Sequence, residues 1–154
     1  MNRGLITALT AIGAAQALKV PIQLLRNKRM DLGQAVASGG MPSSHASGVA
    51  ALAAYSGIKY GVKSPLFSIA SMLGAIVMYD AMNVRRHAGE IAMQVNDLDV
   101  EVEKLAGHHP GVYHMRRAEK LEERIGHQPA EVLVGALLGT VIGAIGALTA
   151  RRSR

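Results

Sequence analysis

The hydrophobic and polar positions of this chain are arranged in long blocks rather than in a strand-like period of two. Apolar blocks cover residues 5–25, 64–82 and 131–150, and a shorter one covers 46–61. A helix needs about 20 mostly apolar residues to cross a bilayer, so the long blocks predict membrane-spanning helices and the short block predicts a fourth. We therefore expect an all-α integral membrane bundle that occupies residues 1–154 as a single domain.

A charged block separates the last two apolar blocks. Its apolar residues are spaced alternately by four and three, at Ile91, Val95, Leu98, Val102 and Leu105. This spacing predicts an amphipathic helix with a heptad-like seam, and a second short helix is expected over about 115–125. The two would form a polar helical hairpin over 88–126 that lies on the membrane or against a second copy of the chain.

Composition narrows the classes of function. The chain has no cysteine, which excludes disulfides and cysteine–metal sites. Its net charge of +6 is scattered at the ends of apolar blocks, which favours anionic lipid headgroups over nucleic acid as partner. The histidines His108, His109 and His114 lie in a loop without nearby acids, so we expect no metal there.

The last apolar block carries a glycine every four residues, at Gly135, Gly139 and Gly143. One face of this helix is therefore smooth enough for close contact with another helix. The alternative is that glycine is simply common in membrane helices. A homodimer through this face or through the polar hairpin is one hypothesis.

Residues 39–45 form a small, polar segment in front of the second apolar block. Two glycines allow a tight turn, and a helix that opens at Pro42 would direct unpaired N–H groups and its positive end at an anion. Ser43 and Ser44 add hydroxyl donors, and His45 can exchange a proton near neutral pH. The segment predicts a phosphate-binding helix start; an ordinary serine cap with an incidental histidine is the alternative.

Two further polar pairs lie at the ends of apolar blocks. Lys19 and Arg26 are nearly two helical turns apart, so both could grip one anion, or both could snorkel to the interface. His127 precedes a helix that Pro129 opens, and Glu131 lies in its first turn. This carboxylate could accept the imidazole N–H and leave the other ring nitrogen free as a nucleophile, or it could simply cap the helix.

These residues occur in a recognisable order along the chain, at Lys19-x6-Arg26, Pro42-Ser43-x-His45 and His127-x3-Glu131. In this order the chain resembles the type 2 phosphatidic acid phosphatase superfamily, which includes the vanadium-dependent haloperoxidases. The stretch 79–90 makes it most similar to a divergent branch of small bacterial and plastid membrane proteins. The resemblance extends over most of the chain, from residue 19 to about residue 139.

The resemblance implies a metal-independent lipid phosphatase that uses no cofactor. His127 would attack phosphorus to form a phosphohistidine, Glu131 would orient it, and His45 would protonate the leaving oxygen. The groups that would hold the phosphoryl oxygens are Lys19, Arg26 and the backbone amides near Ser43 and Ser44. The substrate would be a lipid phosphate or pyrophosphate. The rival interpretation is a non-catalytic phospholipid- or phosphate-binding membrane protein that serves transport or assembly.

The chain departs from the family pattern at four positions. Asparagine, serine and glutamate replace the family's proline, glycine and aspartate at Asn27, Ser44 and Glu131. The arginine expected six positions before the nucleophile falls on Leu121. Arg85 or Arg86 would supply this guanidinium if the hairpin is an insertion within the third motif.

Further polar residues flank these arginines. Tyr79, Asp80 and Glu90 would build a second polar layer at the same membrane face, and an ion pair of Asp80 with an arginine of purely structural role is the alternative. An even number of spans would place the loops 26–45 and 85–131 on one side of the bilayer. Basic residues near both termini favour cytoplasmic termini in a bacterial cell membrane, with the site outside, whereas those at 26–29 and after residue 85 favour the opposite orientation.

Overall fold

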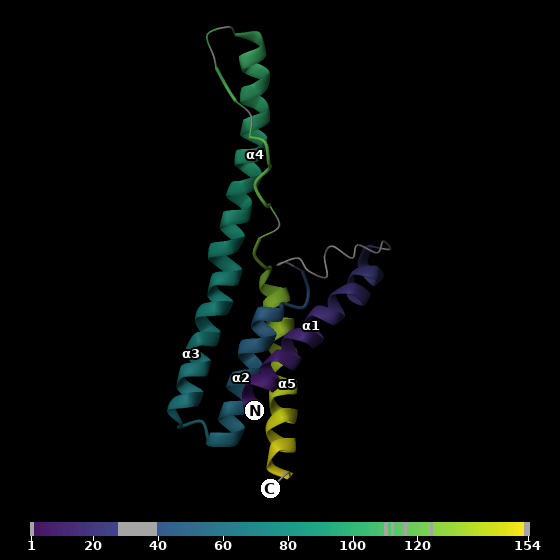
Figure 1. Cartoon of the computed structure of the whole chain (residues 1–154), viewed down its shortest axis with the longest axis vertical. Helices are drawn as coiled ribbons and strands as arrows, with labels where there is room; N and C mark the ends of the chain where they lie inside the picture. Colours follow the sequence, from purple (N-terminus) through teal and green to yellow (C-terminus); the bar gives the residue numbers. More distant parts are fainter. Residues whose placement is uncertain are drawn as a thin grey trace.

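The computed structural model of this chain is a helical bundle from which one long helix projects (Figure 1). It describes residues 2–27, 40–109, 111, 113–115, 117–123 and 125–152, without the side chains of residues 23, 26, 27, 151 and 152. The helices of this part are α1 (Arg3–Asn27), α2 (Ser44–Tyr60), α3 (Pro65–Tyr79), α4 (Arg85–His108) and α5 (Pro129–Arg152), with a π-helical turn η2 (Asp80–Val84) between α3 and α4. No described residue is in a strand, so the predicted all-α class is confirmed.

The helices match the predicted membrane spans. Among the described residues, three stretches are long and apolar enough to cross a bilayer, Arg3–Ile22, Pro65–His108 and Pro129–Ala150. The predicted fourth span is α2, which has 17 residues and packs against α1, α3 and α5. In Figure 1, α1 and α3 run towards the projecting helix, whereas α2 and α5 run away from it. The end of α1 and the starts of α2 and α5 therefore lie towards the same membrane face.

Small residues bring α2 and α5 into backbone contact. The contacts pair Gly135 with Ser43, Gly139 with Ser47 and Gly143 with Ala51. A Cβ at Gly139 would lie 2.7 Å from the carbonyl carbon of Ser47, so only glycine fits. Because the partner positions advance in the same direction by four residues on each helix, α2 and α5 run parallel. The glycine face is thus covered by α2 of the same chain and is not available for the predicted homodimer.

Helix α3 continues through η2 into α4, so the three form one helical rod at the edge of the molecule (Figure 1). The stretch Pro65–His108 has 44 residues. At about 1.5 Å per residue such a rod is about 66 Å long, roughly twice the thickness of the hydrocarbon core. Helix α4 therefore extends out of the membrane on the side where α2 and α5 begin.

The prediction of a second hairpin helix over about 115–125 is wrong. The described residues of 111–128 are not helical, and they return along α4 to the start of α5 (Figure 1). We call residues 111–128 the return segment. The side-chain amide of Asn96 donates to the carbonyl oxygen of Leu121, and its Oδ1 accepts the Leu121 N–H, both at 3.0 Å. The polar face of α4 thus supplies partners for backbone groups that a second helix would have paired internally.

Two more positions on α4 hold the return segment. Asp99 accepts the backbone N–H of Arg117 at 3.3 Å, and its other oxygen lies 2.8 Å from Nε2 of His114. Gly89 allows close approach, because a Cβ there would lie 2.8 Å from the carbonyl oxygen of Glu123. The return segment is therefore fixed at several heights along α4.

Candidate active site

His127 is buried where the return segment meets the bundle. Its backbone N–H donates to the carbonyl oxygen of Ala81 at 3.0 Å, and its side chain is 3% exposed. Neither ring nitrogen has a hydrogen-bond partner among the described residues. Buried polar groups without partners are rare because they have lost their hydration. The ring nitrogens are therefore available to water or to a bound ligand.

The π-helical turn η2 positions the groups around His127. Its wider turn sets residues five apart above one another, so the Arg85 N–H donates to the carbonyl oxygen of Asp80. The side chains of the same two residues meet with Nε and Oδ2 2.6 Å apart. Ala81, whose carbonyl receives His127, lies in the same turn. Short π-helical turns inside helices often occur at functional sites, and this one was not predicted.

The sequence contained one signal of this turn. Asp80 and Arg85 are five residues apart, a spacing that places side chains on different faces of an α-helix. The alternative in which Asp80 pairs with an arginine, if that arginine is Arg85, therefore requires a wider helical turn. Periodicity over a longer window did not reveal it, because η2 has only 5 residues.

His45 lies in the first turn of α2 and faces His127. The two ring centroids are 6.4 Å apart, and the ring planes are inclined by 83°. Ser43 caps α2, because its Oγ accepts the N–H of Ala46 at 3.4 Å. The Ser43 N–H donates to the carbonyl oxygen of Glu131 at 3.0 Å. The amide of Ser43, predicted to hold phosphate, is therefore engaged in joining α2 to α5, and α2 opens after Ser43 rather than at the predicted proline.

Positive electrostatic potential surrounds the His127 ring. Because α2 and α5 are parallel, their partly positive N-terminal ends lie side by side, and the buried Ser44 is the first residue of α2. Lys19, which is 4% exposed, belongs to the same site. Burial lowers the pKa of His127 to about 4, with further contributions from Lys19, His45 and Arg85. The imidazole is therefore neutral at pH 7, the form that can act as a nucleophile.

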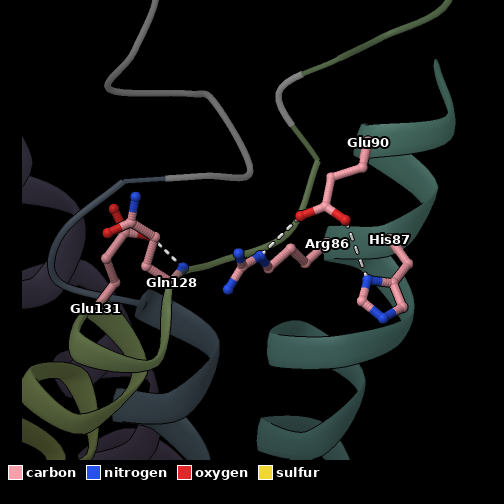
Figure 2. Close-up of polar contacts among 5 residues, drawn as sticks. All are labelled: Arg86, His87, Glu90, Gln128 and Glu131. Carbon is pink, nitrogen blue, oxygen red and sulfur yellow. Dashed lines mark hydrogen bonds and ion pairs between the residues drawn. The ribbon is translucent and has the colours of Figure 1, made fainter. Parts of the chain in front are cut away.

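Glu131 does not contact the His127 ring. Its Oε2 accepts the backbone N–H of Gln128 at 3.1 Å (Figure 2), so the carboxylate caps the helix that it opens. Its negative charge also acts on Lys19. The predicted hydrogen bond from the His127 ring to Glu131 is absent from this structure, and the capping alternative is the one observed.

Arg86 forms a second ion-pair cluster near the start of α4, and its side chain extends towards Gln128 (Figure 2). Its Nε lies 3.1 Å from one oxygen of Glu90, and Nδ1 of His87 lies 3.3 Å from the other (Figure 2). Tyr79 is exposed at the end of α3. The predicted second polar layer therefore does not form as one unit: Asp80 contacts Arg85, Glu90 contacts Arg86, and Tyr79 contacts neither.

Two predicted features fall on parts of the chain that the structure does not describe. Arg26 is in the last turn of α1, but its side chain lies outside the described residues. Gly39, the first glycine of the predicted phosphate-binding segment, also lies outside them. Of the predicted site, the structure places Lys19, His45 and Arg85 near His127, and it joins the backbone of Ser43 to that of Glu131.

An all-helical membrane protein in which a buried histidine lies beside an exposed one and near a buried lysine fits the class that the resemblance predicted. The chain is a member of the divergent PAP2 family, whose model matches residues 1–142. It is 38% identical over 144 residues to the uncharacterized membrane protein YuiD of Bacillus subtilis (strain 168), with 92% of this chain and 91% of that protein covered. No solved structure matches the chain. The predicted family and integral membrane location are therefore confirmed, and the protein is phosphatase-related.

Proposed function

We propose that this protein is a metal-independent phosphatase that removes phosphate from a lipid phosphate or pyrophosphate through a phosphohistidine on His127. The observation that carries the proposal is the buried His127 ring, with both nitrogens unpartnered in the described structure and the ring of His45 6.4 Å away. A low pKa keeps His127 neutral, so its lone pair is available for attack.

The two histidines would divide the chemistry between them. A ring nitrogen of His127 attacks phosphorus, the bond from phosphorus to the ester oxygen breaks, and His45 donates a proton to that oxygen. Water then attacks phosphorus, His45 accepts its proton, and the bond from phosphorus to His127 breaks to release inorganic phosphate. An attacking atom about 3–3.5 Å from phosphorus and a proton donor about 3 Å from the leaving oxygen are compatible with the separation of the rings.

Lys19 and Arg85 are the cations best placed to hold the phosphoryl oxygens. Both charges help to lower the pKa of His127; Arg85 also pairs with Asp80, and Arg86 pairs with Glu90. Arg85 therefore replaces, in this proposal, the family arginine whose position is occupied by Leu121. The first-turn amides of Ser44 and His45 have no acceptor within their own helix and could donate to the same oxygens.

The setting supports a lipid as the substrate. The site lies where α2 and α5 begin, at the membrane face from which α4 projects (Figure 1). A phosphorylated headgroup would reach this level while its chains stay in the bilayer. His45 is exposed, so the general acid could exchange its proton with water between turnovers.

Purified protein in mixed micelles provides the test. Phosphate release would be measured with phosphatidic acid, phosphatidylglycerol phosphate and a polyprenyl pyrophosphate, and a labelled phosphoenzyme would be trapped and tested for the acid lability of phosphohistidine. His127→Ala should abolish release and labelling, and His45→Ala should slow release more than labelling. His109→Ala is the control, because His109 is exposed at the end of α4. Labelling that persists in His127→Ala would refute the assignment.

A second candidate function is non-catalytic binding of phospholipid or phosphate. The observation that favours it is the position of Glu131, which caps α5 and leaves the His127 ring without an orienting acid in this structure. Lipid phosphate that binds to the protein, is never hydrolysed, and is lost in Lys19→Ala would support this alternative.

A further inference from the structure

Helix α4 carries an apolar seam whose isoleucine and leucines are exposed in the described structure and whose two valines are half-buried. We define the α4 seam as Ile91, Val95, Leu98, Val102 and Leu105. The side chains of Ile91, Leu98 and Leu105 are 58%, 56% and 56% exposed. The buried positions of α4 are instead Gly89, Ala92 and Asn96, where the return segment lies. At 3.6 residues per turn the two faces are roughly a third of a turn apart, so the return segment leaves the seam open.

The seam does not face lipid. The rod from Pro65 to His108 is continuous, and α4 extends beyond the bundle along the direction of α3 (Figure 1). A helix that continues a membrane span in this way points away from the bilayer and cannot lie flat on its surface. An apolar strip of this length in water calls for a protein partner.

The order of side chains along the seam indicates that its partner is α4 of a second copy of this chain. Val95 and Val102 occupy heptad position a, and Ile91, Leu98 and Leu105 occupy position d. Valine at a with leucine at d favours two parallel strands with side chains packed between one another. Two copies of this chain in one bilayer have the same orientation, so their α4 helices can meet only in parallel.

The flanks of the seam are compatible with this pairing. In a parallel pair, each position g of one helix lies beside the following position e of the other. Gln94 would lie beside Asp99, and Glu101 beside Ala106, so no acidic side chains oppose each other. Arg117 is held on the e side of α4 through its backbone bond to Asp99. The e side of α4 thus carries the negative charge of Asp99 beside Arg117, and it would face the neutral Gln94 of the other copy.

We propose that two copies of this chain associate in the membrane through the α4 seam as a parallel, in-register coiled coil. The rod forms the edge of the molecule and packs against α2 on one side, so a second copy can approach it without disturbing the bundle. The contact holds two candidate active sites on the same membrane face and does not depend on their activity.

Cysteine crosslinking in native membranes tests the proposal directly, because the chain has no cysteine of its own. Residues at d face their own counterparts across a parallel, in-register pair, so Leu98→Cys and Leu105→Cys should give a disulfide-linked dimer on mild oxidation. Met93→Cys is the matched control, because Met93 is 43% exposed on nearly the opposite side of α4. We expect at least about tenfold more dimer from Leu98→Cys than from Met93→Cys, a ratio set by local proximity.

A second variant distinguishes a packed seam from chance collisions. Leu98→Asp would place two carboxylates against each other in the seam, so Leu105→Cys should lose most of its crosslinking when Leu98→Asp is added. Adding Met93→Asp to Leu105→Cys should leave crosslinking intact. Equal crosslinking at Leu98 and Met93, or crosslinking at Leu105 that Leu98→Asp does not change, would overturn the proposal.

Discussion

The packing of α2 against α5 can be tested with a single methyl group. Gly139→Ala would place a Cβ 2.7 Å from the carbonyl carbon and 2.8 Å from the Cα of Ser47, where non-bonded carbons prefer about 3.5–4.0 Å. The obstructing atoms are backbone, so no rotamer change relieves the contact, and the helices must separate by about 1 Å. Overpacking costs about 1–3 kcal/mol, and alanine recovers about 0.5–1 kcal/mol of helix propensity.

We therefore expect Gly139→Ala to lower the free energy of unfolding by about 1 kcal/mol. Gly13→Ala is the control, since a Cβ at Gly13 would have no atom within 4 Å and should not destabilise the protein. Unfolding by SDS titration in mixed micelles would be followed by tyrosine fluorescence. Tyr55 reports on this contact because it packs against Ala147 of α5. Equal stability of the two variants would refute the parallel contact of α2 with α5.

The same displacement has a functional consequence. Ser43 and His45 begin α2, and His127 immediately precedes α5, so a shift of about 1 Å between these helices moves the two histidines apart. Misplacement of this size can cost about 100-fold in rate. Phosphate release by Gly139→Ala should therefore fall far more than its folded fraction does, whereas Gly13→Ala should retain the wild-type rate.

Three further predictions concern the site and the segment that leads to it. Arg85→Ala should lower the rate of phosphate release by about 10²–10³, as loss of a transition-state donor does, and Arg86→Ala should lower it much less. The pKa of His127 is lowered to about 4 from 6.5, so between these pH values the unfolded chain binds more protons than the folded one. The free energy of unfolding should therefore fall as the pH drops from about 6.5 to about 4. Inorganic phosphate should raise the pKa of His127 in an NMR titration. Gly89→Ala, whose Cβ would meet the backbone of the return segment, should make that segment more sensitive to proteolysis, whereas Gly107→Ala, with open space around it, should not.

Much of the fold followed from local sequence. The apolar blocks predicted the helices α1, α2, α3 and α5 within a few residues, and Ser64 with Pro65 marks the start of α3, where the Ser64 Oγ accepts the Phe67 N–H at 3.2 Å. The prediction of the second hairpin helix was wrong for a non-local reason. Its apolar spacing is compatible with a helix, but Asn96 pairs with the backbone of Leu121 across 25 residues.

The sequence predicted which residues form the candidate site, and the structure corrected which of them are in contact. His45, His127 and Lys19 come together as expected, because helix starts and a buried lysine meet at one face. Glu131 caps α5 instead of hydrogen-bonding to His127. The outcome depends on whether a hydrogen bond to the Gln128 N–H or one to the imidazole is the more stable. Motif spacing is the same in both arrangements, so it could not decide between them.

The sequence by itself determined which stretches enter the membrane, where the helices begin, and which residue types could bind phosphate, because hydropathy and capping act over a few neighbouring residues. Tertiary structure alone decided that α2 and α5 run parallel with glycine against backbone, and that the His127 N–H docks on Ala81 in a π-helical turn. It also placed the Arg85 charge where it acts on the His127 ring. These choices rest on close approach between segments far apart in the chain, where shape complementarity and unpaired backbone groups select one arrangement among several that the local pattern permits.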